Sequence, residues 1–140
     1  MSSSRPLPVE GRNVYVVDDD PAVRSALKFS LEIEGFVVRV FPGASEVLHD
    51  ADLSDCGCLI VDFYIPRMNG LDLVDKLRQE RISVPAILIT SHPSNAVRER
   101  AASAGVRLIE KPFLDNSLIE GVRDAFKKNG ARSAHRWTPS

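Results

Sequence analysis

The chain has 140 residues, 44% of them hydrophobic and 26% charged, and a formal net charge of −1. This length suits one domain with a core of its own, and no run approaches the ~20 apolar residues that span a bilayer. Residues 1–12 lack the apolar segment of an export signal, so we expect a cytoplasmic protein without a membrane partner.

Short apolar runs alternate along the chain with segments of helical periodicity. Val14–Val17 is a β-branched run that predicts a first strand. Pro21 suits the first turn of the next helix, Asp19 or Asp20 is a candidate cap, and Gly35 ends that helix. Further strands are expected at 36–41, 58–61, 86–89 and 106–109. Further helices are expected at 44–50, 71–80 and 94–104, and a last one over the apolar residues between 118 and 126.

The strands are short apolar runs without alternation, which indicates a sheet covered on both faces. Five strands alternating with five helices predict a parallel α/β sandwich with right-handed crossovers.

Charge is distributed unevenly along this domain. Residues 13–126 hold 12 basic and 18 acidic side chains, whereas residues 127–140 hold four basic ones and no acid. We therefore expect a flexible lead at 1–12, a domain at 13–126, and a basic tail or the start of a linker at 127–140. An acidic domain also argues against direct binding of nucleic acid, whose phosphates select Lys and Arg.

The two cysteines, Cys56 and Cys58, lie at the start of the third strand. Their spacing predicts that they share one face of that strand. Two cysteines are too few for a disulfide scaffold, and no second pair of metal ligands accompanies them. We expect both to be buried structural residues.

Polar residues follow four of the five predicted strands: Asp18 to Asp20, Asp62, Thr90 with Ser91, and Lys111. Any one of them alone is a common cap or surface group. In a parallel sheet, however, ligands bind beyond the carboxyl ends of the strands, where all of these groups would gather.

Three carboxylates at one place, from Asp18, Asp19 and Asp62, would repel one another and require positive charge nearby. Lys111 supplies one charge, and a hard divalent cation such as Mg2+ would supply the rest. A metal and a lysine beside a carboxylate nucleophile form a site suited to phosphoryl transfer onto Asp62.

Several motifs resemble those of response-regulator receiver domains. The run Val-Val-Asp-Asp-Asp at 16–20 resembles their acidic loop, and Asp-Phe-Tyr-Ile-Pro-Arg-Met-Asn-Gly at 62–70 resembles their D-x-x-x-P-x-M-x-G phosphoacceptor loop. Thr90-Ser91 resembles their switch threonine, and Lys111-Pro112-Phe113 their K-P-F loop. The resemblance covers residues 13–126, and Ile-Glu-Lys-Pro-Phe at 109–113 is similar to the FixJ-type subgroup.

The resemblance implies a flavodoxin-like (βα)5 doubly wound parallel sheet with strand order 2-1-3-4-5 and a cis Lys111–Pro112 bond. It implies a phosphoacceptor switch of a two-component system. A histidine kinase or phosphotransfer protein would supply the phosphoryl group, and Asp62 would become 4-aspartylphosphate with Mg2+ as cofactor. Such a protein is not an enzyme for another substrate, because it catalyses only its own phosphorylation and dephosphorylation.

The resemblance also assigns roles to individual residues. Asp19 would bind Mg2+ directly and Asp18 through water, while Asp62 and the backbone carbonyl of Tyr64 would complete the protein ligands. The phosphoryl oxygens would be bound by three groups: the Thr90 hydroxyl, the Ser91 amide and the Lys111 ammonium. Asp20, the third acid of the run, is expected to cap a helix.

Two features depart from the family pattern. The family usually has an aromatic residue three positions before the lysine, where this chain has Leu108. Only Val106 and Arg107 separate Gly105 from Leu108, where the family usually has three residues. We therefore expect the fifth strand to change little on phosphorylation.

The signal would then pass through Thr90 and the segment 91–98, which leads into a weakly apolar helix. Exposed charges of that helix would meet the partner: Arg98, Glu99 and Arg100. The partner would be a second copy or a downstream protein, bound at the surface formed by the fourth helix, the fifth strand and the last helix.

Three other functions fit the sequence less well. An FMN site would need a loop of backbone donors after the first strand, where this chain has three aspartates. A haloacid-dehalogenase-type phosphatase would need D-x-D-x-[TV] there, and Asp18-Asp19-Asp20-Pro21-Ala22 does not complete it. The third is a phosphate-independent docking or dimerisation module with the same fold, against which the intact Asp62, Thr90 and Lys111 argue.

Overall fold

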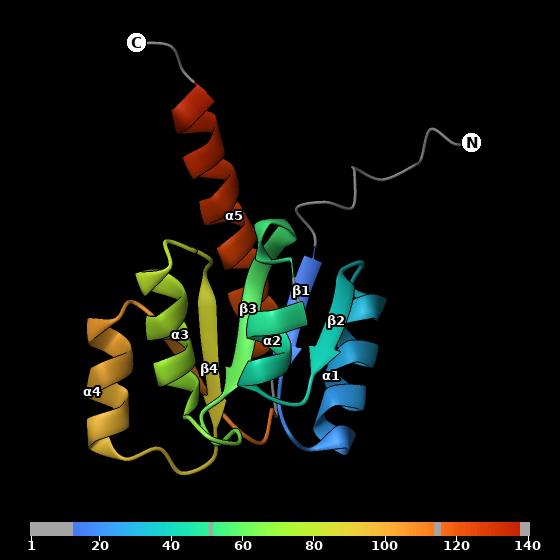
Figure 1. The fold of residues 1–140 in the computed structure, drawn as a ribbon. Helices are drawn as coiled ribbons and strands as arrows, with labels where there is room; N and C mark the ends of the chain where they lie inside the picture. Colours follow the sequence, from blue (N-terminus) through green and yellow to red (C-terminus); the bar gives the residue numbers. More distant parts are fainter. Residues whose placement is uncertain (1–12, 51, 114–115, 138–140) are drawn as a thin grey trace.

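A computed structural model describes residues 13–50, 52–113 and 116–137, so the lead expected at 1–12 lies outside the described residues (Figure 1). Within the described ranges, no helix has the length and apolar composition needed to cross a bilayer.

Five parallel strands form one sheet in the order β2-β1-β3-β4-β5. The strands are β1 (Asn13–Val17), β2 (Val37–Phe41), β3 (Cys56–Asp62), β4 (Ala86–Thr90) and β5 (Arg107–Glu110). The helices are α1 (Pro21–Ile33), α2 (Ala44–Asp50), α3 (Gly70–Gln79), α4 (Asn95–Ser103) and α5 (Ser117–Trp137), with a short 3-10 turn η2 (Leu53–Asp55) before β3. The flavodoxin-like fold and strand order are confirmed.

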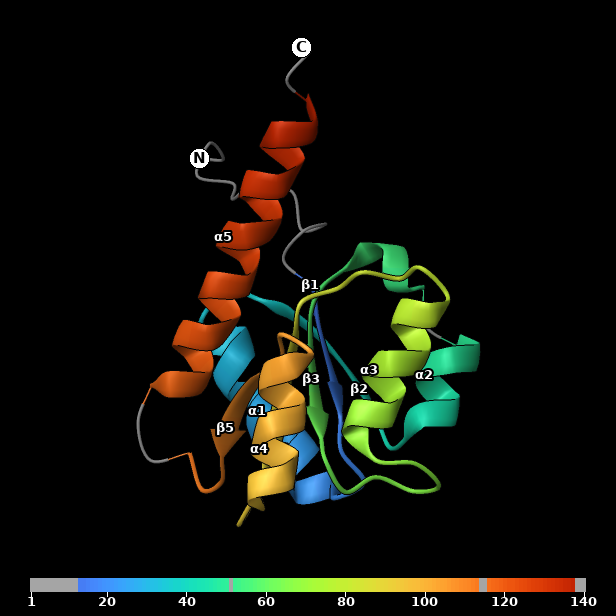
Figure 2. The same cartoon turned by 90° about the vertical axis from the view of Figure 1, so that its left-hand side faces the viewer.

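The sheet is covered on both faces. In Figure 2 the strands lie between α1 and α5 on one side and α2 and α3 on the other, and α4 packs on the side of α2 and α3 through Ala101. Leu27 and Leu31 of α1 pack with Val122 of α5 in one core cluster, whereas Val47 of α2 packs with Leu73 of α3 in the other. Every residue of β3 and β4 is buried, which confirms that the unalternating runs are two-sided strands.

The helices that follow β1 and β3 have side-chain caps at their amino ends. The Asp20 carboxylate accepts a hydrogen bond from the Ala22 amide, so the predicted role of Asp20 as a helix cap is confirmed. Asn69 and Asp72 form a capping box at the start of α3. These caps hold the loops that follow β1 and β3 in defined positions.

Cys56 and Cys58 do not share a face, so that prediction was wrong. Asn13 pairs with Cys56 but Val14 pairs with Cys58, which leaves Gly57 as the extra residue of a bulge. The bulge shifts the side-chain alternation, so Cys56 faces the α2–α4 layer and Cys58 the α1–α5 layer. Both are buried free thiols, and burial raises the pKa of Cys56 to about 12.

Helix α5 is longer than the apolar pattern indicates. It continues to Trp137 and runs past the amino ends of the strands, at the end of the molecule opposite their carboxyl ends (Figure 1). The segment expected as a basic tail is therefore helical over 127–137, and residues 138–140 lie outside the described residues.

The bulge at Gly57 brings the backbone of β3 against α5. A Cβ atom at Gly57 would lie 2.1 Å from Cε1 of Phe126, whose ring stacks on Phe36 with centroids 5.3 Å apart. We expect Gly57→Ala to lower the free energy of unfolding by about 1–3 kcal/mol, because the trapped ring must move. Urea unfolding followed by circular dichroism measures this loss.

Two variants control this prediction. Gly43→Ala should be nearly neutral, because its nearest contact would be a Glu46 carboxylate oxygen at 3.3 Å on a side chain that can move. Combining Gly57→Ala with Phe126→Leu should cost less than the sum of the single changes. A Gly57→Ala variant as stable as the wild type would contradict the packing argument.

Candidate functional site

The carboxyl ends of β1, β3, β4 and β5 lie at one edge of the sheet, the lower edge in Figure 1. Val17 pairs with Val61, so Asp18, directly after β1, and Asp62, the last residue of β3, lie at the same level. Thr90 pairs with Glu110, which places Lys111 beside the end of β4. The topology therefore gathers the polar residues at the edge where the sequence analysis expected them.

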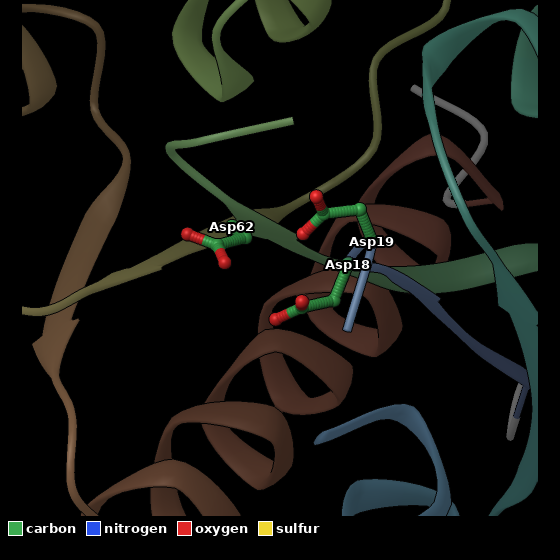
Figure 3. Close-up of side chains that lie close together, drawn as sticks. All are labelled: Asp18, Asp19 and Asp62. Carbon is green, nitrogen blue, oxygen red and sulfur yellow. The ribbon is translucent and has the colours of Figure 1, made fainter. Parts of the chain in front are cut away.

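The carboxylates of Asp18, Asp19 and Asp62 converge, as Figure 3 shows. One oxygen from each lies within 4.8 Å of the others. Asp18 and Asp62 are buried, whereas Asp19 is exposed and forms the open side of the cluster. Three acids so close repel one another strongly unless cations offset them.

Lys111 provides one such cation. Its Nζ donates to Oδ2 of Asp62 at 2.9 Å and to Oδ2 of Asp18 at 3.2 Å. Burial of the lysine acts to lower its pKa, but the hydrogen bond and charge of Asp62, with the charge of Asp18, outweigh burial, and the pKa of Lys111 is raised. The ammonium therefore remains protonated at neutral pH.

For Asp18, burial outweighs the neighbouring groups that favour the charged form, so the pKa of its carboxyl is raised. Burial raises the pKa of Asp18 first, the Asp20 amide lowers it, and the neighbouring charge of Asp62 raises it again. The net direction is upward, even though Lys111 pulls it down. The charged form of Asp18 is thus held in the folded chain at a cost, and cations near it would relieve that cost.

The loop from Asp62 to Gly70 is held by its own backbone. The Tyr64 amide donates to Oδ1 of Asp62 at 3.1 Å, and the Gly70 amide donates to the Phe63 carbonyl at 2.8 Å. A Cβ atom at Gly70 would lie 2.5 Å from the Asp62 carbonyl oxygen, so only glycine permits this approach. The Tyr64 side chain is exposed, and its ring meets the Phe63 ring edge-on.

The acidic loop after β1 is held from several sides. The Asp18 amide donates to the Phe41 carbonyl at 3.1 Å, and the Asp20 amide donates to Oδ1 of Asp18 at 2.9 Å. Nη1 of Arg24, one turn into α1, donates to the Asp18 carbonyl oxygen at 2.7 Å. Arg24 could not be recognised as a site residue from the sequence, because one cation on a helix carries no recognisable motif.

Thr90 and Lys111 are joined through the backbone at the ends of β4 and β5. Thr90 is buried, and its hydroxyl donates to the Ser91 carbonyl at a long 3.3 Å. The Lys111 amide donates to the Thr90 carbonyl at 2.9 Å, and the Lys111–Pro112 peptide is cis, as expected. Ser91 is exposed beside Thr90.

Helix α4, beyond Ser91, packs loosely. Among its described residues only Ala101 is buried. Arg100 contacts Asp72 and Asp75 of α3, each at 2.8 Å, and Arg98 contacts Glu110 of β5 at 2.7 Å. Arg98, Glu99 and Arg100 were expected to be exposed charges that meet a partner. Their side chains are exposed or half-exposed, as expected, although both arginines also form ion pairs within the chain.

The donor set at this edge fits Mg2+. The cluster offers only oxygen ligands from carboxylates, which is the chemistry that this hard cation selects. Mg2+ binds oxygen at about 2.0–2.1 Å and keeps several waters, so carboxylate oxygens that all lie within 4.8 Å of one another could hold it directly or through a bound water. Asp18, Asp19 and Asp62 are the residues that would hold it.

Comparison with known proteins matches residues 14–123 to the response regulator receiver domain. The response regulator protein TodT of Pseudomonas putida (strain F1) is 37% identical over 115 residues, which cover 81% of this chain and 51% of TodT. The transcriptional regulatory protein FixJ of Rhizobium meliloti (strain 1021) is 37% identical over 113 residues, which cover 80% of this chain and 55% of FixJ.

Solved structures agree with these matches. The crystal structure of FixJ-N has a TM-score of 0.73 and 36% identity, covering 82% of this chain and 93% of FixJ-N. The response regulator StyR has a TM-score of 0.81 and 33% identity, covering 89% of this chain and 63% of StyR.

This chain therefore belongs to the response regulator receiver domain family. The resemblance to FixJ that its motifs indicated is confirmed. The chain spans about half the length of the curated relatives it matches.

The raised pKa of Asp18 gives a test of the electrostatics. We expect Asp18→Asn, without divalent cations, to raise the free energy of unfolding near pH 7 by on the order of 1 kcal/mol, because a buried charge beside Asp62 is removed. Asp62 remains as the partner of Lys111. Urea unfolding at several pH values measures the difference.

The sign of the pH dependence follows from linkage. A folded-state pKa above the ordinary 3.8 means that the folded chain binds this proton more tightly than the unfolded chain. The penalty of Asp18 is therefore complete above its folded pKa and disappears as the pH falls towards 3.8. The advantage of Asp18→Asn should shrink on acidification. A variant that is less stable near pH 7, or an advantage independent of pH, would contradict this account.

Proposed function

We propose that this chain is the phosphoacceptor switch of a two-component signalling system. Asp62 takes a phosphoryl group from a sensor histidine kinase or a phosphotransfer protein, with Mg2+ as cofactor. The observation that carries the proposal is the contact of one lysine, Lys111, with two carboxylates, Asp18 and Asp62, while Asp19 stands open beside them.

Asp62 is the nucleophile of this reaction. One carboxylate oxygen forms a bond to phosphorus while the bond from phosphorus to the donor nitrogen breaks, and the electron pair leaves with the donor. The product is 4-aspartylphosphate. The Tyr64 amide and the close approach of Gly70 hold Asp62 still, which reduces the entropy lost on reaching the reactive geometry.

The positive groups of the site act on the phosphoryl oxygens. Lys111 is protonated and already within 2.9 Å of Asp62, so it can pair with the acyl phosphate once the free carboxylate is consumed. Mg2+, when bound, neutralises charge that develops on the phosphoryl group. Its protein ligands would be Asp19 directly, Asp18 through water, Asp62, and the Tyr64 carbonyl.

Thr90 and Ser91 complete the phosphoryl site. The Thr90 hydroxyl makes only a 3.3 Å hydrogen bond to the Ser91 carbonyl, so a phosphoryl oxygen at Asp62 is a stronger competing acceptor. The Ser91 amide would bind another oxygen. The state of Asp62 would thus be reported by Thr90 at the end of β4.

In this proposal the chain is not an enzyme for a separate substrate, because it catalyses only its own phosphorylation and dephosphorylation. It works in the cytoplasm and does not itself bind nucleic acid, consistent with the acidic balance of residues 13–126. Its output is a change in a protein-binding surface at α4, β5 and α5, for a second copy or a downstream protein.

Phosphorylation is tested by incubating the chain with a small acyl-phosphate donor and reading its intact mass. We expect one phosphoryl group on the wild type with Mg2+ and little without it, because the acids around Asp62 repel an anionic donor. Asp62→Asn should remain unlabelled. Equal labelling of Asp62→Asn would refute the assignment, and an unlabelled wild type would favour the phosphate-independent docking module.

Within that experiment, the variant Lys111→Ala distinguishes Mg2+ binding from the conformational response to phosphorylation. The variant should still bind Mg2+, because the three carboxylates remain, but should lose the conformational response to phosphorylation. Loss of Mg2+ binding in this variant would show that the lysine is needed to assemble the acids.

We propose that the conformational change caused by phosphorylation passes from Asp62 through Thr90 to α4. Leu108 of β5 is half-buried against the α2–α4 layer and has no polar group to exchange with solvent, so it can remain in place in both states. Helix α4 has one buried residue among those described and is tied to its neighbours mainly by half-exposed ion pairs. Such pairs contribute little stability, so α4 can shift at low cost.

Hydrogen exchange with and without beryllofluoride, a phosphoryl mimic, tests this route. We expect changes in protection over residues 91–100, larger than those over 106–110. Asp62→Asn treated with the same mimic is the control and should show neither. Large changes in 106–110 with none in 91–100 would contradict the route through α4.

A further inference from the structure

We propose that Arg24 is a positioning residue for the metal site, holding the Asp18–Asp19 peptide so that both carboxylates point to one place. Arg24 lies on α1, is half-buried, and donates from Nη1 to the Asp18 carbonyl oxygen at 2.7 Å. The inference rests on the proposed function in one respect, because it takes Asp18 and Asp19 as magnesium ligands.

The atom that Arg24 holds is the one that sets the direction of Asp19. The Asp18 carbonyl and the Asp19 amide belong to the same planar peptide unit, so an anchored carbonyl oxygen orients the Asp19 backbone. The amide end of Asp18 is held separately by the Phe41 carbonyl at 3.1 Å. Between them, Phe41 and Arg24 hold the backbone of Asp18 at both ends.

Arg24 is itself anchored to the same loop. Its amide donates to the Asp20 carbonyl at 3.0 Å, and the Asp20 side chain caps α1 through the Ala22 amide at 2.9 Å. The acidic loop and the first turn of α1 thus form a closed set of hydrogen bonds. The guanidinium bond at 2.7 Å is charge-assisted, a class about twice as strong as neutral hydrogen bonds.

A simple electrostatic role for Arg24 would have the opposite consequence. A cation near a metal site repels the metal, so removing its charge alone would strengthen Mg2+ binding. Removing a positioning residue instead releases the peptide and weakens binding. Substitutions of residues that orient metal ligands cost about 10–100-fold in metal affinity. The sign of the change therefore separates the two roles.

Calorimetric titration of Mg2+ into the unphosphorylated chain measures the effect without any phosphotransfer. We expect Arg24→Met to bind Mg2+ about 10-fold more weakly than the wild type. Arg24→Lys keeps a cationic donor on a flexible side chain and should recover part of the affinity. Lys28→Met is the matched control, because Lys28 is a cation one turn further along α1 that pairs with Glu32. It should bind Mg2+ as the wild type does.

Urea unfolding in the presence of EDTA shows whether each variant is folded. If Arg24→Met does not fold, the Mg2+ affinity of Arg24→Lys tests the inference instead. Unchanged or tighter Mg2+ binding by the folded Arg24 variants would overturn the inference and leave the proposed function standing. An equal loss in Lys28→Met would also overturn it, because the effect would then belong to α1 in general. A wild-type chain that binds no Mg2+ would overturn both.

Discussion

The contact of Lys111 with Asp18 and Asp62 is the interaction on which the rest of this structure depends. The parallel sheet brings three carboxylates within 4.8 Å of one another, and burial makes their repulsion costly. One ammonium from the end of β5 bonds to two of these acids and links three strands at the edge of the sheet. The repulsion that remains among the three acids would be relieved by the further positive charge of a bound metal ion.

The backbone around the site resists that repulsion. Hydrogen bonds hold Asp18 through its amide, its carboxylate and its carbonyl, and the tight approach of Gly70 holds the main chain of Asp62. Rigid placement matters because like-charged groups would otherwise rotate apart. The same preorganisation suits a reaction whose catalysis consists of positioning and charge neutralisation.

Stability is distributed unevenly between the sheet and helix α4. The residues around the site are held by buried strands, whereas α4 has one buried residue and is tied to α3 and β5 by partly exposed ion pairs. A change at Thr90 would therefore meet little resistance in α4 and much more in β4. Under the proposed function, this contrast would let phosphorylation of Asp62 alter a distant surface without unfolding the core.

Local patterns in the sequence determined a parallel α/β sandwich, the helix cap at Asp20 and the gathering of acids and lysine at one edge, whereas the strand order followed from the resemblance to receiver domains. Apolar runs, caps and glycines act over a few residues, and parallel topology then requires strand ends to meet. Only the tertiary structure decided the bulge at Gly57, the extent of α5, the ion pairs of α4 and the contact of Arg24 with Asp18. These depend on how elements distant in sequence pack and on where long side chains reach, and neither leaves a periodic signal along the chain.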